Sequence, residues 1–273
     1  MKKKLSILTI AVLSIGLILS GCGNSKQANG SQAQDSSLKE IKEKGEFVVG
    51  LDDSFPPMGF KDDKGEIVGF DIDLAKEAAK RMGVKAVFKP VQWDGVLLSL
   101  NNKDIDVIWN GLTITDKRKE QIAFSNVYLQ NKQIIVVKND STIKGKKDLS
   151  GKVVGIQLGS SSETALTADK ETSSALKDTR KYSNNTEALM DLNQGRVDAV
   201  IVDEVVGRYY ISKKPGLYKV LDEDFGKEDY GVGIRKNDNS FKEELNKTLD
   251  AMKADGTADK ISQKWFGKDI ITK

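Results

Sequence analysis

Short apolar runs alternate along this chain with helical stripes, and this alternation limits the fold more than any other feature of the sequence. Runs typical of buried strands occupy residues 47–51, 84–88, 107–109, 134–137, 153–156 and 199–202. Helical patterns lie between them, and the clearest apolar stripe comprises Phe241, Leu245, Leu249 and Met252. Strands that alternate with helices predict an α/β fold whose sheets are mixed, mainly parallel and flanked by helices.

The stretch Asp106–Arg118 combines a buried strand with side chains suited to binding. Its apolar run ends at Asn110 and Gly111, which predict a loop at the strand's C-terminal end, where open α/β sheets bind ligands. Gly111 lets a ligand approach the backbone, and Thr113 supplies a hydroxyl. Arg118 carries a planar fork of donors that fits a carboxylate. A strand, a turn and a surface arginine would explain the same residues.

An internal echo indicates two similar lobes. Residues 100–108 (LNNKDIDVI) resemble residues 192–200 (LNQGRVDAV), and both segments read as a helix end, a tight turn and a buried strand. The first strand runs into the Asn110 loop, and the second runs into Asp203. Two sheets that each present polar residues beyond a strand end suggest two lobes that face a shared cleft.

The second predicted lobe offers one group for each charge of a ligand. Ser160 and Glu163 have the spacing of a capping box, and the N–H groups of the helix that follows could receive an anion. From spacing alone, a plain helix cap is the more usual explanation. Asp203 could accept from an ammonium group or could cap the helix after it.

Three aromatic residues, Phe55, Trp93 and Trp109, lie next to predicted loops. Such residues usually pack in a core. They could instead form a wall against a ligand's side chain. The two prolines after Phe55 favour a rigid, extended loop, which supports Phe55 as part of such a wall.

The amino-acid composition excludes several kinds of catalytic and metal-binding site. The chain has no histidine and one cysteine, Cys22, so Ser-His-Asp and Cys-His nucleophiles, His-ligated zinc and intrachain disulfides are all excluded. We expect neither a metal nor a cofactor. Lys2–Lys4 account for the formal charge of +3, which leaves the rest of the chain neutral. This balance gives no support for a nucleic-acid partner.

The first 37 residues are predicted to be a targeting segment and a tether. Lys2–Lys4 precede an apolar stretch, 5–19, that is short for a membrane span. The sequence Leu-Ser-Gly-Cys then ends at Cys22 and resembles a bacterial lipobox, in which the cysteine is lipidated. We expect residues 1–22 to be a lipoprotein signal peptide with its lipobox cysteine, and residues 23–37 to be a disordered tether.

Six segments together resemble the family-3 solute-binding proteins of polar amino-acid ABC importers. They read GLDDSFPPMGF, IVGFDIDLAKEAAKRMG, WNGLTITDKRKEQIAFS, VVGIQLGSSSE, RVDAVIVDE and DGTADKISQKWFG. The resemblance covers about residues 38–267. The resemblance implies a two-lobed periplasmic-binding-protein-like fold with the ligand between the lobes. It places lobe 1 at 38–130 and 231–273 and lobe 2 at 131–230, with crossings near Leu129–Lys132 and Asp229–Gly231.

The resemblance also implies how an amino acid is held by its backbone groups. Arg118 is expected to clamp the α-carboxylate. Thr113, the backbone of Asn110-Gly111 and Ser161 are expected to assist it. Asp203 is expected to pair with the α-ammonium.

The ligand's side chain is expected to meet a different set of residues. Phe55 and Trp93 would sandwich it, while Asp52 and Gln157 would meet its polar end. Trp109 is expected to lie beside the site without touching the ligand. These residues leave the choice among cationic, neutral polar and cystine-like side chains open.

The resemblance implies an extracytoplasmic lipoprotein, anchored to the cell membrane by Cys22, that delivers a free amino acid to the permease of an ABC importer. We expect a monomer without enzymatic activity. A ligand-binding module for a sensor partner would use the same chemistry. A dehydratase, which the same fold hosts, would need an acid–base group over the leaving group, and none is evident.

Replacing Cys22 with alanine should release the protein from the membrane fraction, because two acyl chains anchor a protein stably and the variant carries none. Fractionation of cells that express each form measures this effect. Unchanged processing and membrane retention of the Cys22→Ala variant would contradict the lipobox interpretation.

Overall fold

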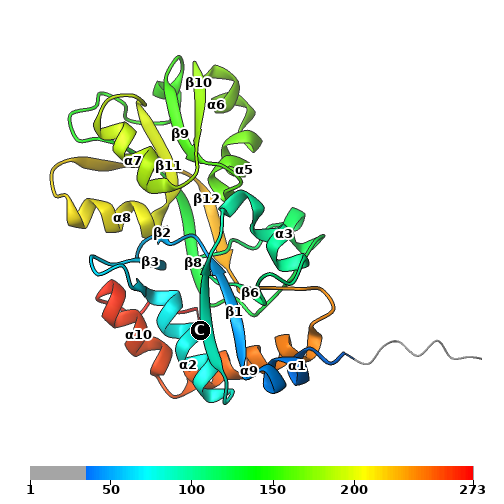
Figure 1. The fold of residues 1–273 in the computed structure, drawn as a ribbon. Helices are drawn as coiled ribbons and strands as arrows, with labels where there is room; N and C mark the ends of the chain where they lie inside the picture. Colours follow the sequence, from blue (N-terminus) through cyan, green and yellow to red (C-terminus); the bar gives the residue numbers. More distant parts are fainter. Residues whose placement is uncertain (1–34, 273) are drawn as a thin grey trace, which may run out of the picture. The chain divides into compact units, whose positions relative to one another are not determined.

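The computed structural model describes residues 35–272, which form two lobes, each built on a five-stranded sheet. Figure 1 shows the two sheets one above the other, with helices packed on both. The sheet of lobe 1 has the strand order β5-β1-β6-β13-β7, and that of lobe 2 has the order β10-β9-β11-β8-β12. The predicted two-lobed α/β fold is therefore confirmed.

Lobe 1 is built from both ends of the described chain. Its large sheet comprises β1 (Glu46–Leu51), β5 (Lys85–Pro90), β6 (Val107–Ile108), β7 (Ala123–Phe124) and β13 (Gly233–Ile234). A small antiparallel sheet comprises β2 (Ser54–Phe55), β3 (Gly59–Lys61) and β4 (Ile67–Val68). The helices are α1 (Ser37–Lys44), α2 (Phe70–Arg81), α3 (Val96–Asn101), α4 (Asp116–Lys119), α9 (Asn239–Ala254) and α10 (Thr257–Phe266), with the 3₁₀ turn η1 (Trp93–Gly95). The predicted stripe of α9 is buried in this lobe.

Lobe 2 is built from the middle of the chain. Its sheet comprises β8 (Leu129–Lys138), β9 (Val153–Gln157), β10 (Asp178–Tyr182), β11 (Ala199–Asp203) and β12 (Tyr218–Tyr230). The helices are α5 (Ser161–Ala168), α6 (Lys170–Ala175), α7 (Asn185–Asn193) and α8 (Glu204–Lys213), with the 3₁₀ turn η2 (Lys146–Leu149). β11 is buried along its whole length, as its continuous apolar run predicts.

Both large sheets are half parallel and half antiparallel. β1 pairs in parallel with β5 and β6, and β9 pairs in parallel with β10 and β11. The remaining pairs involve β13 in lobe 1 and β8 in lobe 2, and these are antiparallel. Parallel pairing thus holds where a helix links neighbouring strands. The antiparallel pairs are made by the strands next to the crossings between lobes.

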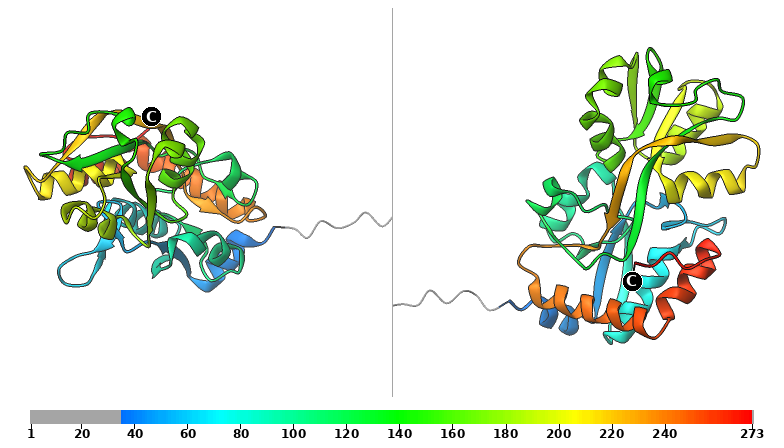
Figure 2. Two further views of the ribbon diagram at one scale, coloured as in Figure 1. Left: turned by 90° about the horizontal axis from the view of Figure 1, so that it is seen from above. Right: turned by 180° about the vertical axis from the view of Figure 1, so that it is seen from behind.

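Two strands cross between the lobes side by side. The start of β8 pairs with the end of β12, from Leu129 opposite Tyr230 to Lys132 opposite Lys227. We call this paired segment, residues 129–132 and 227–230, the crossing ribbon. Figure 2 shows β8 and β12 running together from one lobe into the other. The two segments that the sequence suggested as crossings therefore form one antiparallel unit.

The echo of residues 100–108 and 192–200 has a common structure. At its fourth position, Lys103 and Gly195 both adopt left-handed φ angles, 64° and 70°. At its seventh position, the carboxylates of Asp106 and Asp198 each accept a backbone N–H of the neighbouring strand, at 2.9 and 2.8 Å. The same turn therefore delivers β6 and β11 to corresponding places in the two sheets.

The described part of the chain begins with contacts to α9. Asp35 accepts from the backbone N–H of Ser240, and Ser37 lies 3.0 Å from the Ser240 hydroxyl, so residues 35–37, placed in the tether by sequence, pack on lobe 1. Cys22 and the rest of the tether lie outside the described residues. Within residues 35–272, none of the helices combines the length and the apolar character needed to cross a bilayer.

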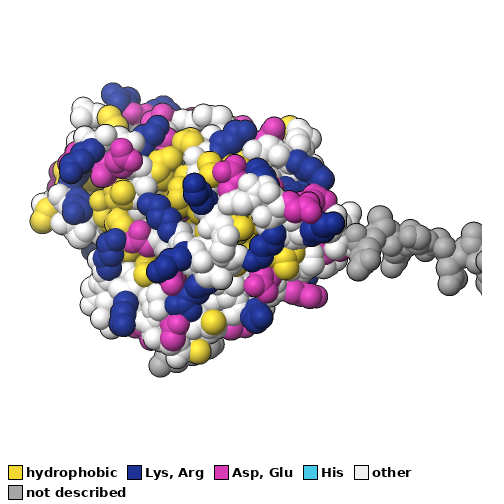
Figure 3. Space-filling view, turned by 60° about the horizontal axis from the view of Figure 1, so that its bottom comes forward, with side chains coloured by type: hydrophobic (Ala, Val, Ile, Leu, Met, Phe, Trp, Pro, Cys, Tyr) yellow, Lys and Arg dark blue, Asp and Glu magenta, His cyan; other side chains and the backbone are white. Residues whose placement is uncertain are grey.

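Basic and acidic side chains are interspersed over the face drawn in Figure 3. Among the described residues, charged side chains of neighbouring elements form pairs, such as Arg81 with Asp255 and Lys264 with Asp73. Surface pairs of this kind contribute about 0–1 kcal/mol each. Mixed charges therefore leave this face without an extended field of one sign.

Replacing Lys103 with glycine should raise the free energy of unfolding by about 0.5–1 kcal/mol. A left-handed backbone costs a residue with a Cβ roughly 1–2 kcal/mol, which glycine's greater freedom in the unfolded chain partly offsets. The thermal midpoint should rise by about 1–4 °C. The matched exchange Gly195→Lys should lower it, although a Cβ there meets no atom within 4 Å. Calorimetry that shows Lys103→Gly to be no more stable would contradict the comparison of the two turns.

Candidate functional site

Hydrogen bonds join the two lobes across the cleft between their sheets. The Thr113 hydroxyl of lobe 1 donates to the Ser161 hydroxyl of lobe 2 at 3.0 Å. The Gln157 amide of lobe 2 donates to the Asp52 carboxylate of lobe 1 at 2.8 Å. All four side chains are buried. The cleft is therefore closed, with polar groups of both lobes facing its interior.

A buried carboxylate of α2 holds the loop after β6 in place. Asp71, on α2, is fully buried and accepts the Gly111 N–H at 2.7 Å and the Tyr128 hydroxyl at 2.9 Å. Burial raises the pKa of Asp71 to about 7, and the two hydrogen bonds oppose that rise. The Gly111 N–H is thus already engaged by Asp71, so Gly111 can offer a ligand its carbonyl but not the N–H donor that the expected assistance to the carboxylate clamp requires.

Glycine is required at position 111 for two reasons. Its φ angle is +61°, in the left-handed region. A Cβ there would lie 3.0 Å from the rings of both Phe55 and Tyr230. Asn110, one residue earlier, accepts the Asp52 N–H at 3.0 Å and so joins the β1 loop to the β6 loop.

Arg118 comes from the short helix α4, which sequence reasoning missed. The Thr115 hydroxyl caps this helix by accepting the Arg118 N–H at 3.2 Å. The guanidinium donates to the Thr113 carbonyl at 2.9 Å and to the Gly159 carbonyl of lobe 2 at 3.3 Å. Burial lowers the pKa of Arg118, and the carboxylates of Glu228 and Asp203 oppose the shift. A guanidinium remains charged in such a setting.

Asp203, the last residue of β11, does not cap α8 with its side chain. Its carboxylate instead accepts from Tyr230 at 2.6 Å, from Gln133 at 2.8 Å and from Asn131 at 2.9 Å. Burial and the neighbouring Glu228 carboxylate raise the pKa of Asp203 to about 8, against the hydrogen bonds from Tyr230 and Gln133. A buried carboxylate with neutral partners can accept a cation.

Sequence reasoning missed the residues that surround Asp203. Asn131 and Gln133 project from β8, and Glu228 and Tyr230 from β12, at alternate positions of the paired strands. The Gln133 amide also donates to Ser161 at 3.1 Å and to Glu228 at 2.8 Å. Polar residues two apart at the start of an otherwise apolar strand were the available signal.

The N-terminus of α5 faces the same cleft. Ser160 caps the helix by accepting the Glu163 N–H at 3.2 Å, as the capping-box spacing predicts. The Glu163 carboxylate accepts the Gly159 N–H at 2.8 Å. Ser161 and Ser162 are buried at the first turn, where the helix presents its positive dipole end. The helix-cap reading is thus confirmed, and the anion-binding reading stays a prediction, because a capped helix can still present its first turn to an anion.

The opposite end of the cleft holds Asp52, Gln157 and two aromatic rings. The rings of Phe55 and Trp93 are within 7° of parallel, with centroids 6.5 Å apart, and both side chains are buried. Burial raises the pKa of Asp52, and hydrogen bonds from Ser54 and Gln157 oppose the rise. Trp109 lies in the lobe 1 core, 6.3 Å from the Tyr128 ring.

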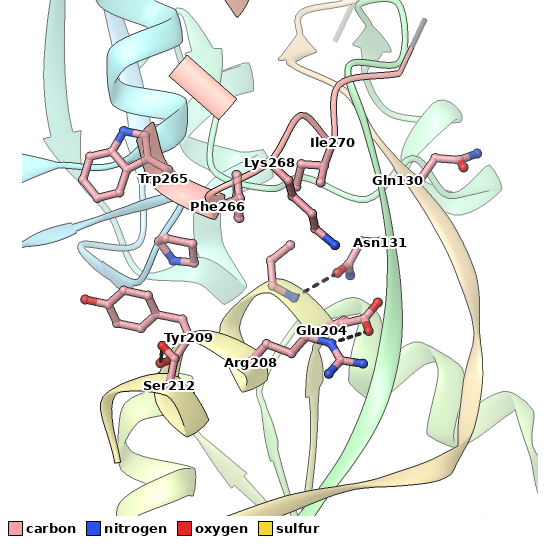
Figure 4. A pocket seen from close by; sticks show the side chains of 12 residues that line it. Gln130, Asn131, Glu204, Arg208, Tyr209, Ser212, Trp265, Phe266, Lys268 and Ile270 are labelled. Atoms are coloured by element: carbon pink, nitrogen blue, oxygen red, sulfur yellow. Dashed lines mark hydrogen bonds and ion pairs between the residues drawn. The ribbon is translucent and has the colours of Figure 1, made fainter. Parts of the chain in front are cut away.

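Three cavities adjoin these groups. One of about 350 Å³ is lined by Asp52 and Trp93, and one of about 670 Å³ is lined by Arg118 and Gly159. A third, of about 360 Å³, lies between α8 and the C-terminal segment (Figure 4). Asn131 lines this third cavity while its amide donates to Asp203, so it separates the cavity from the buried carboxylate.

The sequence matches the model of the bacterial extracellular solute-binding proteins, family 3, over residues 47–268. The chain belongs to that family. The suspected relationship is thus confirmed over nearly the whole described chain.

Three relatives show how widely the ligands in this family differ. The L-cystine-binding protein TcyJ of Escherichia coli is 37% identical over 88% of this chain and 90% of its own. A substrate-binding protein of an ABC uptake transporter from Streptococcus pneumoniae, solved with bound histidine, is 36% identical, covers 88% of this chain and 99% of its own, and superposes with a TM-score of 0.85. An ancestral arginine-binding protein bound to glutamine is 46% identical, covers 82% of this chain and 99% of its own, and has a TM-score of 0.77.

Proposed function

We propose that this protein captures a free amino acid outside the cytoplasm and delivers it to an ABC importer. The observation that carries the proposal is the placement of Arg118 and Asp203, one from each lobe, at a single closed cleft. An amino acid carries a carboxylate and an ammonium on adjacent atoms, and these two residues supply the opposite charges. The relatives named above support an amino acid as the ligand.

In this proposal each backbone group of the ligand has its own partners. Arg118 binds the α-carboxylate in its bidentate fork, with Thr113 and Ser161 as hydroxyl donors. Asp203 accepts the α-ammonium, and the backbone of Asn110-Gly111 contributes its carbonyl groups. Ligand entry replaces the hydrogen bonds that these residues now make with one another.

The side chain of the ligand would occupy the other end of the cleft. There Phe55 and Trp93 form the walls, while Asp52 and Gln157 meet its polar end. Aromatic walls supply apolar contact area without fixing the chemistry of the tip. The polar residues at that end therefore decide which side chain binds.

We also propose the partners that the sequence suggested. Acyl chains on Cys22, diacylglyceryl and palmitate-type, would anchor a monomer at the extracytoplasmic face of the cell membrane, where it would meet the permease subunits. The same capture step would serve a sensor partner. Growth on the ligand as sole nitrogen source, with and without the permease, separates import from signalling.

The protein is proposed to bind without catalysis. The carboxylates that face the cleft, Asp52 and Asp203, are held by several donors each, and dehydration needs one group that is free to transfer a proton to the leaving group. Incubation with prephenate should leave it unchanged.

Replacing Arg118 with alanine should weaken amino-acid binding by roughly 2–5 kcal/mol, because it leaves a buried carboxylate of the ligand unpaired. This corresponds to a loss of at least about 30-fold in affinity by titration calorimetry. Arg118→Lys should recover only part of it, since an ammonium lacks the fork.

The matched control for this variant is Lys117→Ala, which removes an exposed cation at the adjacent position. It should bind within about threefold of wild type, because an exposed charge contributes little. An Arg118→Ala variant that also stays within that range would assign Arg118 to the surface.

Ligand should shift the lobes from an open to the closed arrangement, with the bend at the crossing ribbon. A zwitterion that touches both lobes favours the closed form, which is what a population shift requires. Small-angle scattering should show a smaller radius of gyration with ligand, and the intrinsic fluorescence change should largely disappear in Trp93→Phe. Arg118→Ala at the same ligand concentration is the control. Identical scattering with and without saturating ligand would remove the closure step.

A further inference from the structure

In the proposed site the ligand's side chain meets Asp52. The groups around this carboxylate indicate which class of side chain binds there. Resting on the proposed function, we propose that the amino acid bound here has a cationic side chain, a guanidinium or an ammonium, which Asp52 receives.

Asp52 is a buried carboxylate whose partners are all neutral. Its side chain is accessible to only 7%. One oxygen accepts the N–H and the hydroxyl of Ser54, at 2.9 and 2.6 Å, and the other accepts the Gln157 amide at 2.8 Å. No lysine or arginine within residues 35–272 lies within 4.0 Å of it, although Lys61 pairs with the adjacent Asp53. The chain also has no histidine to supply a charge.

Gln157 is oriented as a donor to Asp52, and one unused acceptor lies next to Gln157. The Asn185 amide donates to the Gln157 oxygen at 3.0 Å, which fixes the Gln157 nitrogen towards Asp52 and the Ser183 carbonyl. The Asn185 oxygen is buried and has no hydrogen-bond partner among the described residues. A side-chain tip made only of donors, such as a guanidinium or an ammonium group, matches the Asp52 carboxylate and the Asn185 oxygen.

The aromatic walls favour a cation in the same place. Phe55 and Trp93 present nearly parallel rings with centroids 6.5 Å apart. A cation between the two centroids lies within the roughly 6 Å over which a ring face attracts positive charge. Trp93 and Asp52 also line the same cavity, so the attractive face and the carboxylate are neighbours.

Acidic side chains outnumber basic ones in the cleft, and this excess favours a ligand with a cationic side chain. Asp52, Asp203 and Glu228 are acidic, whereas Arg118 is the one cation that we place in this cleft among the described residues. An amino acid with a neutral side chain adds no net charge and leaves Asp52 without a counter-ion. A side-chain carboxylate would add repulsion, whereas a cationic side chain gives Asp52 a counter-ion and lowers the excess of acidic groups by one.

The test compares arginine with citrulline, which has the same length and shape but a neutral tip, by titration calorimetry. Lysine, ornithine, glutamine, glutamate and cystine complete the panel. We expect arginine or lysine to bind at least about 30-fold more tightly than citrulline, as is typical for a desolvated charge pair. In Asp52→Asn this preference should fall to within about threefold. Asp53→Asn, which removes the adjacent carboxylate already paired with Lys61, should keep the preference.

Two outcomes would overturn the inference. The first is that glutamine, citrulline or cystine binds at least as tightly as the tightest-binding cationic amino acid. The second is that the Asp52→Asn variant keeps the wild-type preference for a cationic side chain over citrulline. Failure of the proposed function looks different, since then no free amino acid binds or Arg118→Ala binds as wild type. The wild-type panel alone decides the side-chain class, so the result does not depend on how well the variants fold.

Discussion

The removal of carboxylates from water is the constraint on which the cleft depends. Asp203 ends a fully buried strand, and its hydrogen-bond donors are all uncharged. Asp52, at the other end of the cleft, is also buried and also accepts only from uncharged donors. Such groups are costly in a folded protein unless a cation reaches them or a proton neutralises them. The fold stabilises each carboxylate with several hydrogen-bond donors, and the proposed ligand would add the positive charge that these donors lack.

Two tyrosines at the crossing ribbon, Tyr128 just before it and Tyr230 at its end, connect it to the two halves of the candidate site. Tyr128 precedes the first crossing strand and donates to Asp71, which holds the Gly111 loop. Tyr230 ends the second crossing strand and donates to Asp203. The two tyrosine rings lie 6.4 Å apart. Each half of the candidate site is therefore connected by one buried hydroxyl to the segment about which the lobes would move, and packing joins the two hydroxyl-bearing rings.

Much of this architecture could be predicted from the sequence, because it depends on local patterns. The apolar run before Asn110 predicts a strand, the stripe of α9 predicts a helix, and Gly195 predicts a turn, each from residues close together in the sequence. Asn131, Gln133 and Glu228 could not be assigned to the site, because their role depends on the pairing of β8 with β12 across nearly a hundred residues of chain. The parallel fraction of the sheets was overestimated for the same reason, since sequence spacing does not show where a strand leaves one sheet for another. Helix α4 was missed because four residues are too few to show a period.

The pairing within the crossing ribbon also limits how the lobes can move. Two independent strands would allow the lobes to slide, twist and bend, whereas strands joined at 129–132 and 227–230 act as one band. A band of this kind resists shear in its plane, because shear would break its hydrogen bonds, and it flexes across its thin direction. The lobes then have one soft coordinate, and in the proposed closure a single distance would report whether the cleft is occupied. Two dyes placed on the outer surfaces of the lobes would convert this protein into an optical gauge of its own ligand, with a reading independent of what the ligand is.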